Sequence, residues 1–394
     1  MKQCAAWRML RVKGMTVNLQ PADARDLRRV WDAPVRIVHG LLIVCVAGAW
    51  LTREAQQIDL HAAFGYCALG LVLFRIAWGF LGTRHARFAS FAYSPRATLA
   101  YLRDAIQRHP RHYTGHNPAG SWAVYGLLAL IGGATLSGVV AMGAMYGEGP
   151  VGPTSFALAD QVLAWHEILA WAVLVLAVLH VIGALWGSYV HQENLPAAMI
   201  TGRKAVHDTH AADAPSRTAT GALVLATAIA VGFGYAAMWS PIDQERRTRK
   251  DAAVKATLKA QAWSRECGSC HLAYSPALLP LASWKRTLDE QEKHFGEDLA
   301  LGAAAVRRLL EHAGSVATPS WAAWKLASAV PTGEAPLEIS TTPFWRAAHA
   351  TLQEGDFKPP RSAGRHDCEA CHRDAASGIF HPRMIHMAKG RVSN

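Results

Sequence analysis

Five segments of the chain are apolar over about 20 residues, which is the length of helix that crosses a bilayer. They lie at about 35–52, 61–81, 122–145, 163–187 and 220–239. From about residue 262 onwards, charged and apolar residues mix as they do in a soluble domain. The pattern predicts an all-α protein in which membrane helices are followed by a small, mostly α-helical C-terminal domain.

Basic residues are distributed unevenly and thereby predict the orientation of the chain. The 394 residues are 51% hydrophobic and 18% charged, with a formal net charge of +11. Lys and Arg gather at the start of the chain and between the second and third segments, at Arg8, Arg11, Lys13, Arg25, Arg28, Arg29, Arg36, Arg84, Arg87, Arg96, Arg103, Arg108 and Arg111. Because basic loops stay in the cytoplasm, we expect a multi-pass protein of the bacterial inner membrane with a cytoplasmic N-terminus and a periplasmic C-terminal domain. The charge needs no nucleic-acid partner.

The spans divide the chain into four expected parts. Residues 1–30 form a cytoplasmic segment, and residues 31–205 form a four-helix membrane domain. Residues 206–245 supply a linker and a fifth transmembrane helix, which tethers the C-terminal domain of residues 246–394. The first 30 residues lack an apolar core, so we expect no cleavable signal peptide and a first span that acts as signal anchor. Translation can begin at Met1 or at Met15.

Four of the seven cysteines fall into two identical motifs in the C-terminal domain. These are Cys267-Gly268-Ser269-Cys270-His271 and Cys368-Glu369-Ala370-Cys371-His372. The C-x-x-C-H pattern is typical of c-type haem attachment, in which both thiols form thioethers and the histidine binds the iron. A zinc half-site or a redox dithiol is the alternative for one motif, but two motifs in a periplasmic domain favour two covalent c-type haems. Cys4, Cys45 and Cys67 lack such a pattern.

The second axial ligand of each c-type haem is left open by the motifs themselves. His294 and His312 are the candidates for the first haem. Candidates for the second haem are His349, His366, His381, His386, Met384 and Met387. His366 is too close to its own motif to reach over the ring, and each remaining histidine could equally be a surface residue.

Two histidines frame the fourth apolar segment, HEILAWAVLVLAVLH. His166 and His180 are 14 residues apart, so on a helix they lie about 21 Å apart along the axis and within roughly 40° of one face. In the predicted topology, His61 shares the outer depth with His166, and His39 shares the inner depth with His180. These pairs predict two non-covalent b-type haems, with hydrogen-bonded core histidines as the alternative. The third segment has small residues that would let a macrocycle approach, at Gly132, Gly133, Gly138 and Gly143, and His191 is a backup for His180.

The membrane part resembles the bacterial cytochrome b561 and nickel–iron hydrogenase b-type cytochrome family. The resemblance covers residues 28–205 and rests on VWDAPVRIVHG, on HAAFGYCALGLVLFRIAWGFLGTRHARFASF and on the span with His166 and His180. It implies a four-helix cytochrome that binds two b-type haems and exchanges electrons with quinones. The implied ligands are His39, His61, His166 and His180. The chain departs from the family at Gly40, where an aromatic residue often stands.

The tail resembles the periplasmic dihaem cytochromes c that donate electrons to a small oxygen-binding haem protein. The resemblance covers about 266–378 through CGSCHLAYSPALLPLASW, KHFGEDLALG, ISTTPFWRAAH and CEACHRDAASG. It implies bis-histidine ligation, with His294 opposite His271 and His349 opposite His372.

Together these patterns predict an electron carrier with two b-type and two c-type haems. Electrons from a quinol in the membrane pool would leave through the c-type haems to a periplasmic cytochrome or oxygen-binding haem protein, which is quinol:cytochrome c oxidoreductase activity if the chain acts as an enzyme. One alternative is a cytochrome subunit that delivers electrons from a partner hydrogenase or dehydrogenase to the quinone pool. Another is a haem-based sensor or gas-binding protein. The outer carboxylates of Glu148, Asp160 and Glu167 are left without a role.

Overall fold

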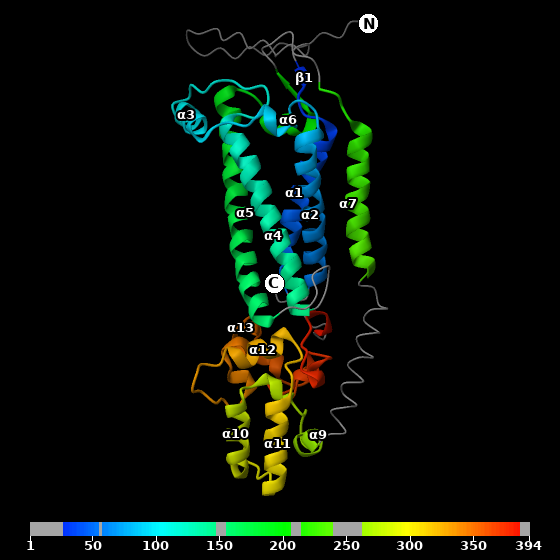
Figure 1. Ribbon diagram of the computed structural model, residues 1–394, viewed down its shortest axis with the longest axis vertical. Helices are drawn as coiled ribbons and strands as arrows, with labels where there is room; N and C mark the ends of the chain where they lie inside the picture. The colour runs from blue at the N-terminus through cyan, green and yellow to red at the C-terminus, as the bar shows by residue number, and fades with distance from the viewer. Residues whose placement is uncertain (1–26, 55–56, 147–154, 206–213, 239–261, 387–394) are drawn as a thin grey trace. The chain divides into compact units, whose positions relative to one another are not determined.

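The computed structural model describes residues 27–54, 57–146, 155–205, 214–238 and 262–386. Met1, Met15, Cys4, Glu148 and Met387, which the sequence singled out, lie outside these ranges. The described residues are mostly helical (Figure 1), as the apolar pattern predicted.

Four long helices correspond to the first four apolar segments. They are α1 (Ala33–Leu51), α2 (Ile58–Leu81), α4 (Pro118–Tyr146) and α5 (Phe156–His191), and they run side by side (Figure 1). Each is long and apolar enough to cross a membrane. The helix α5 is longer than its predicted range. Its 36 residues span about 54 Å, which is more than the hydrocarbon core requires. Hydropathy marks the part of a helix that matches lipid, and the helix itself continues into the interface.

The outer faces of these helices are apolar, which is what a lipid environment demands. Only 6% of the most apolar window of α5 is buried. Large side chains on its exposed surface include Trp165, Ile168, Trp171 and Val175. In water such a surface would drive aggregation, so the helices need lipid around them.

The predicted fifth span coincides with a helix, α7 (Thr218–Met238). Among the described residues, four helices meet the length and hydropathy of a membrane span, and within α7 only Thr218–Thr227 counts as a shorter apolar helix. The helix is therefore observed, and its passage through the membrane stays a prediction.

A small sheet is the one departure from the all-α prediction in the described residues. Strand β1 (Leu27–Arg29) pairs antiparallel with β2 (Arg203–Ala205). Gly202 ends α6 (Leu195–Thr201) with φ 80, and its carbonyl accepts the backbone N–H of Val30. Only glycine adopts this conformation without strain. Strands of three residues are too short to leave a hydrophobic alternation, so the sequence pattern could not reveal them.

By its internal packing the chain divides into two units. The first contains residues 1–38, 75–126 and 176–224, and the second contains 39–74, 127–175 and 225–394. The first unit has a small core of Val30, Trp31, Val35 and Ala86. Its helix α3 (Pro95–Ile106) is capped by Ser94, whose hydroxyl accepts the N–H of Ala97 at 3.3 Å. The domain boundaries expected at residues 30, 205 and 245 stay predictions.

Among the described residues, the second unit includes five short helices of the C-terminal domain. They are α9 (Ala262–Cys267), α10 (Leu281–Asp289), α11 (Ala303–Ser315), α12 (Trp321–Ser328) and α13 (Pro343–Ala348). One core cluster contains Trp263, Leu288 and Leu309 and packs against Cys267 of the first motif. The other contains Leu278, Ala323, Leu326 and Trp345. The first C-x-x-C-H motif thus lies against a small core cluster.

Candidate haem-binding sites

His61 of α2 and His166 of α5 face each other inside the second unit. Their ring centroids are 5.9 Å apart, with an interplanar angle of 75°. His61 Nδ1 donates to the carbonyl of Ala49 at 2.8 Å, and His166 Nδ1 donates to that of Ala134 at 2.8 Å. A hydrogen bond from Nδ1 fixes the tautomer that leaves Nε2 free to bind a metal. Both imidazoles are therefore in the tautomer that an axial ligand requires.

The distance between these rings matches the space that a bound iron needs. Imidazole nitrogen binds metals at about 2.0–2.1 Å. Two such bonds, with about 1 Å from each nitrogen to its ring centre, give a separation of about 6 Å between centroids. The pair at His61 and His166 fits a b-type haem on this measure.

Gly138 of α4 provides room for the ring of His166. A Cβ at this position would lie 3.1 Å from His166 Cε1 and 3.3 Å from its Nδ1. Such contacts are too short for a rigid neighbour, so any side chain here would displace the imidazole. Of the small residues singled out in the third segment, Gly138 is the one that the structure places against a candidate ligand.

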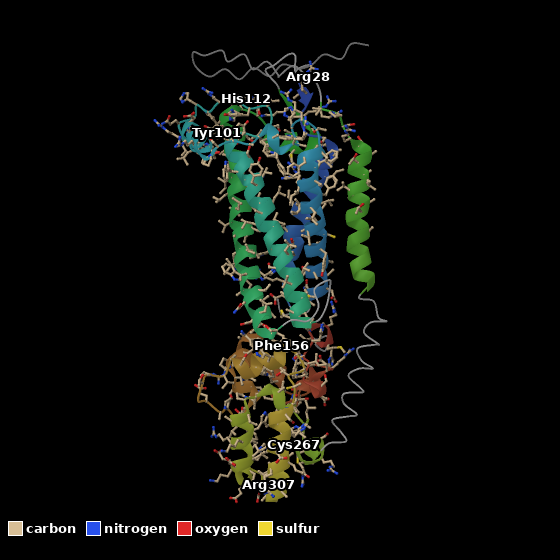
Figure 2. The ribbon with its side chains drawn as sticks, viewed as in Figure 1. Arg28, Tyr101, His112, Phe156, Cys267 and Arg307 are labelled. Atoms are coloured by element: carbon tan, nitrogen blue, oxygen red, sulfur yellow. The ribbon has the colours of Figure 1, made fainter. Side chains whose placement is uncertain are left out.

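The first C-x-x-C-H motif has the same arrangement of imidazoles. Cys267 (Figure 2) ends α9, and His271 follows it in the loop. The rings of His271 and His294 are nearly parallel, with centroids 6.2 Å apart and an interplanar angle of 29°. His271 Nδ1 donates to the carbonyl of Leu272 at 2.7 Å.

The second motif pairs His372 with His349. The centroids of these rings are 6.1 Å apart, at an interplanar angle of 70°. His349 follows α13 and stacks on Trp345 at 4.3 Å, while its Nδ1 donates to the carbonyl of that tryptophan at 2.8 Å. Cys368 begins a single 3-10 turn, and Cys371 follows it directly. The second motif, like the first, therefore has a second imidazole at about 6 Å from its own histidine.

The other candidate axial ligands have different surroundings. His312 lies against Trp263 with centroids 5.7 Å apart. The carbonyl of His366 accepts a hydrogen bond from the hydroxyl of Tyr274. His381 packs against Tyr146 at 4.8 Å. The backbone N–H of His386 donates to the carbonyl of Cys371 at 2.8 Å. The structure therefore brings His294 and His349 to the motif histidines, as the resemblance implied.

Burial favours the neutral form, which binds a metal, at three imidazoles of the C-terminal domain. Burial and the nearby charges of His349 and His386 lower the pKa of His372 to about 4. Burial also lowers the pKa of His294 and of His349. Metal ligation requires the neutral imidazole, and these residues hold it at neutral pH. Among the described residues, no group of three or more His, Cys, Asp or Glu side chains could hold a bare metal ion.

The inner histidines belong to different units, and their pairing stays a prediction. His39 lies on α1 and His180 on α5. The backup candidate, His191, hydrogen-bonds to the hydroxyl of Tyr101 at 3.3 Å and packs edge-on against His112 at 5.4 Å. The imidazole of His191 thus contacts the side chains of Tyr101 and His112, which are labelled in Figure 2.

Two ion pairs in the second unit involve carboxylates of the long helices. Lys325 Nζ lies 2.6 Å and 2.7 Å from the two carboxylate oxygens of Asp160. Arg383 bonds to the carboxylate of Asp59. Asp160 was left without a role by the sequence, and the structure shows it as an ion-pair partner. The sequence pattern missed both pairs because the partners are far apart in the chain.

Three pairs of facing imidazoles, two of them at C-x-x-C-H motifs, are what bis-histidine haem sites require, and they occur in a chain with helices long enough to cross a membrane. Comparison with known families agrees with this class. Residues 30–202 match the prokaryotic cytochrome b561 family, and residues 263–380 match the dihaem cytochrome c family. The chain thus joins a part similar to membrane b-type cytochromes to a part similar to dihaem cytochromes c. These families imply b-type haems and two c-type haems, and a role in electron transport.

Several curated relatives cover the membrane part. A probable Ni/Fe-hydrogenase B-type cytochrome subunit from Rhodobacter capsulatus is 24% identical over 239 residues, which are 49% of this chain and 89% of that protein. The corresponding subunit from Azotobacter vinelandii is 25% identical over 237 residues, which are 48% of this chain and 96% of that protein.

Solved structures are similar to the C-terminal part. The diheme cytochrome c from Rhodobacter sphaeroides is 32% identical, covers 30% of this chain and 94% of its own, and gives a TM-score of 0.27. A diheme cytochrome c from Shewanella baltica is 25% identical, covers 33% of this chain and 92% of its own, and gives a TM-score of 0.26.

Proposed function

We propose that this chain carries electrons from a membrane quinol to a soluble haem protein in the periplasm, with two b-type and two c-type haems as its redox groups. The observation that carries the proposal is the repeated pair of imidazoles, with centroids 5.9, 6.2 and 6.1 Å apart. Pairs of this kind occupy both axial positions, which suits electron transfer and leaves no open position for a gas. This supports a carrier over a haem-based sensor.

The bound haems would supply one-electron transfer, and the chain's own residues would supply its conditions. The carbonyls of Ala49 and Ala134 accept the Nδ1–H of His61 and His166, which leaves both Nε2 atoms to bind the iron. The second b-type haem is assigned to His39 and His180, which the family's ligand pattern supports. Apolar helices around both levels exclude water, and low solvent access sets the potential of a haem.

The proposed orientation places the C-terminal domain in the periplasm, with α7 as its fifth, tethering span. The basic residues of the loop between α2 and α4 support a cytoplasmic location for that end of the helices. The ion pairs Lys325–Asp160 and Arg383–Asp59 support passage of electrons between the His61–His166 level and the C-terminal domain.

The test adds a reduced quinol analogue to the purified full-length protein and follows the b-type and c-type α-bands separately. We expect the b-type band to rise first and the c-type band to follow, and the reduced c-type haems then to reoxidise when a soluble periplasmic haem protein is added. If the b-type haems are reduced and the c-type haems are not, the proposed electron transfer from the b-type to the c-type haems is wrong. Reduction of neither would show that quinol is not the donor.

A second candidate function reverses the flow. The relatives of the membrane part are named as subunits of a Ni/Fe-hydrogenase, and this favours a cytochrome subunit that passes electrons from a partner oxidoreductase to the quinone pool. The two functions differ in one measurement. In membranes supplied with the partner's substrate, the second predicts that b-type reduction depends on the partner and that an added quinone reoxidises the b-type haems, whereas the first predicts reduction by quinol alone.

A further inference from the structure

Arg75 is a charged side chain in the middle of an apolar helix. It lies on α2 and is 6% exposed, and its Nη1 is buried with no hydrogen-bond partner among the described residues. Burying a lone guanidinium inside a membrane bundle costs free energy, and such a group is usually paired with an anion. The side chain also packs over the ring of Phe88, with Cζ 5.2 Å from its centroid. A packed aromatic ring does not satisfy a guanidinium N–H.

The acid whose charge reaches Arg75 is already occupied. The carboxylate of Asp32 is fully buried. Its Oδ1 accepts the N–H of Val35 at 2.9 Å, and its Oδ2 accepts Trp78 Nε1 at 3.0 Å and Thr83 Oγ1 at 2.7 Å. Asp32 therefore caps α1 and holds the end of α2, and it forms no ion pair with Arg75 among the described contacts. The positive charge of Arg75 remains without a direct partner.

His116 is the second unsatisfied group at the same place. Its ring lies between Trp31, at 4.6 Å, and Phe91, at 4.4 Å, and its Nδ1 is buried with no partner among the described residues. Burial and the positive charges of Arg75, His180, His85 and Lys204 lower its pKa to about 3. Lys204 is itself paired with Glu193 at 3.1 Å, whereas Arg75 Nη1 and His116 Nδ1 have no hydrogen-bond partner among the described residues.

The spacing along α2 places Arg75 at the level of His180. Arg75 follows His61 by 14 residues on α2, as His180 follows His166 by 14 residues on α5. Both steps advance about 21 Å and turn within roughly 40° of the starting face. The starting residues face each other at 5.9 Å, so equal steps along two inward-running helices bring Arg75 and His180 to one level, each facing the bundle.

We propose that Arg75 and His116 bind a propionate carboxylate of the b-type haem whose ligand is His180. Two buried donors, one of them permanently charged, and the matching spacing of Arg75 and His180 along their helices fit a carboxylate at the edge of that haem. Arginine suits this task because its planar donors match a carboxylate and its charge is permanent. The inference rests on the proposed function in one respect, which is that His180 binds the inner haem.

The test compares Arg75→Gln with Arg84→Gln in the full-length protein purified with its haems. Arg84 follows α2 and is exposed, so its substitution removes the same charge without removing a buried donor. In a redox titration, we expect Arg75→Gln to shift one b-type haem to lower potential, because a nearby positive charge stabilises the reduced iron. The other b-type haem and both c-type haems should keep their potentials, as should all four in Arg84→Gln.

A second measurement asks about the carboxylate itself. The b-type sites of the full-length chain are reconstituted with haem or with its dimethyl ester, which has no free propionate. We expect the inner site of the wild type to bind the ester about tenfold or more weakly than haem, since a charge-assisted hydrogen bond is lost. Arg75→Gln should lose that preference. His116→Phe should reduce it, while keeping the ring between Trp31 and Phe91.

The outcomes separate this inference from the proposed function. If Arg75→Gln keeps wild-type potentials and the wild-type preference for haem over its ester, the proposed propionate site is wrong. The assignment of the haem ligands does not depend on that result. If His180→Ala retains both b-type haems, the inner haem assignment fails instead. Arg75→Lys, which keeps the charge but not the planar pair of donors, should retain most of the potential and lose part of the preference.

Discussion

The imidazoles of His61 and His166 lie 5.9 Å apart, and each donates Nδ1–H to a backbone carbonyl. This relationship fixes the tautomer of both ligands before any haem is bound. Preorganised ligands lose less conformational freedom on binding, so the site should depend on each imidazole.

His166→Ala should therefore remove one b-type haem and leave the other three haems in place. Pyridine haemochrome spectra would show the ratio of b-type to c-type haem fall from about one to about one half, and both c-type haems would still stain on a denaturing gel. His191→Ala, on the same helix, is the control and should keep the wild-type ratio. Retention of both b-type haems in His166→Ala would contradict the assignment.

Gly138→Leu should have a similar effect for a different reason. The added side chain begins 3.1 Å from the ring of His166, so the imidazole must turn away from its acceptor, Ala134. The helix itself tolerates the change, since leucine is a better helix former than glycine by roughly 1 kcal/mol. We expect loss or weak retention of the outer b-type haem, seen as a lower b-type absorbance with helix content unchanged by circular dichroism.

Gly183→Leu is the matched control for that substitution. Gly183 is also on a membrane helix, but a Cβ there would meet no atom within 4 Å. The variant should keep both b-type haems. Equal haem loss in the two variants would mean that the effect comes from the helix and not from the ring of His166.

His294→Ala should open one axial position on the first c-type haem, whereas His312→Ala should not. The ring of His294 lies 6.2 Å from that of His271, and the ring of His312 packs on Trp263 instead. The open haem would bind carbon monoxide, so reduced His294→Ala should show a carbon monoxide difference spectrum that the wild type and His312→Ala lack. A carbon monoxide response in His312→Ala alone would show that His312, and not His294, is the second axial ligand of the first c-type haem.

Candidate haem ligands can be named from the sequence because their chemistry requires particular residues at particular spacings. Two cysteines and a histidine at fixed spacing identify a c-type haem site, and a spacing of 14 residues gives the face and the depth of His166 and His180 on a helix. The pairing of His294 and His349 with their motifs needed the family resemblance. Several histidines in the same domain satisfy the distance along the chain, and only the folded domain selects among them.

Other features left no mark that a sequence pattern can show. The carbonyls of Ala49 and Ala134 orient the ligands, yet every residue has a carbonyl. The buried donors Arg75 and His116 are far apart in the chain, and periodicity alone does not show that Asp32 is already occupied. The strands β1 and β2 are stabilised by backbone pairing across residues 29 and 203. These features depend on tertiary contacts, which hydropathy and spacing do not record.

Acidification should destabilise the first unit in part through His85. Burial and the charges of Arg84 and Lys204 lower the pKa of this imidazole below its ordinary value of 6.5. The unfolded chain therefore takes up a proton near pH 6.5, while the folded chain takes it up only at lower pH. Stability is full above pH 6.5 and is lost as the pH falls below it, through the lowered pKa.

His85→Gln should reduce this loss of stability. Thermal unfolding of the detergent-solubilised protein at pH 7 and pH 5 would show a smaller fall in Tm for the variant than for the wild type. His109→Gln replaces an exposed imidazole of the same unit and should keep the wild-type fall. An equal fall in all three proteins would show that His85 does not contribute.

The ion pair between Lys325 and Asp160 should assist electron passage from the b-type to the c-type haems. Lys325→Glu and Asp160→Lys each put like charges where the structure has a pair at 2.6 Å. Both side chains are partly exposed, at 28% and 35%, so the pair is worth about 1 kcal/mol or less and each single variant should slow c-type reduction by up to about fivefold. The double variant restores opposite charges and should recover most of the rate, and high salt should narrow all differences between the rates.

Lys285→Glu, an exposed position on α10, is the control and should keep the wild-type rate. Stopped-flow measurement of the c-type α-band after quinol addition gives these rates, and single variants as fast as the wild type, or a double variant as slow as the singles, would exclude a role for the pair.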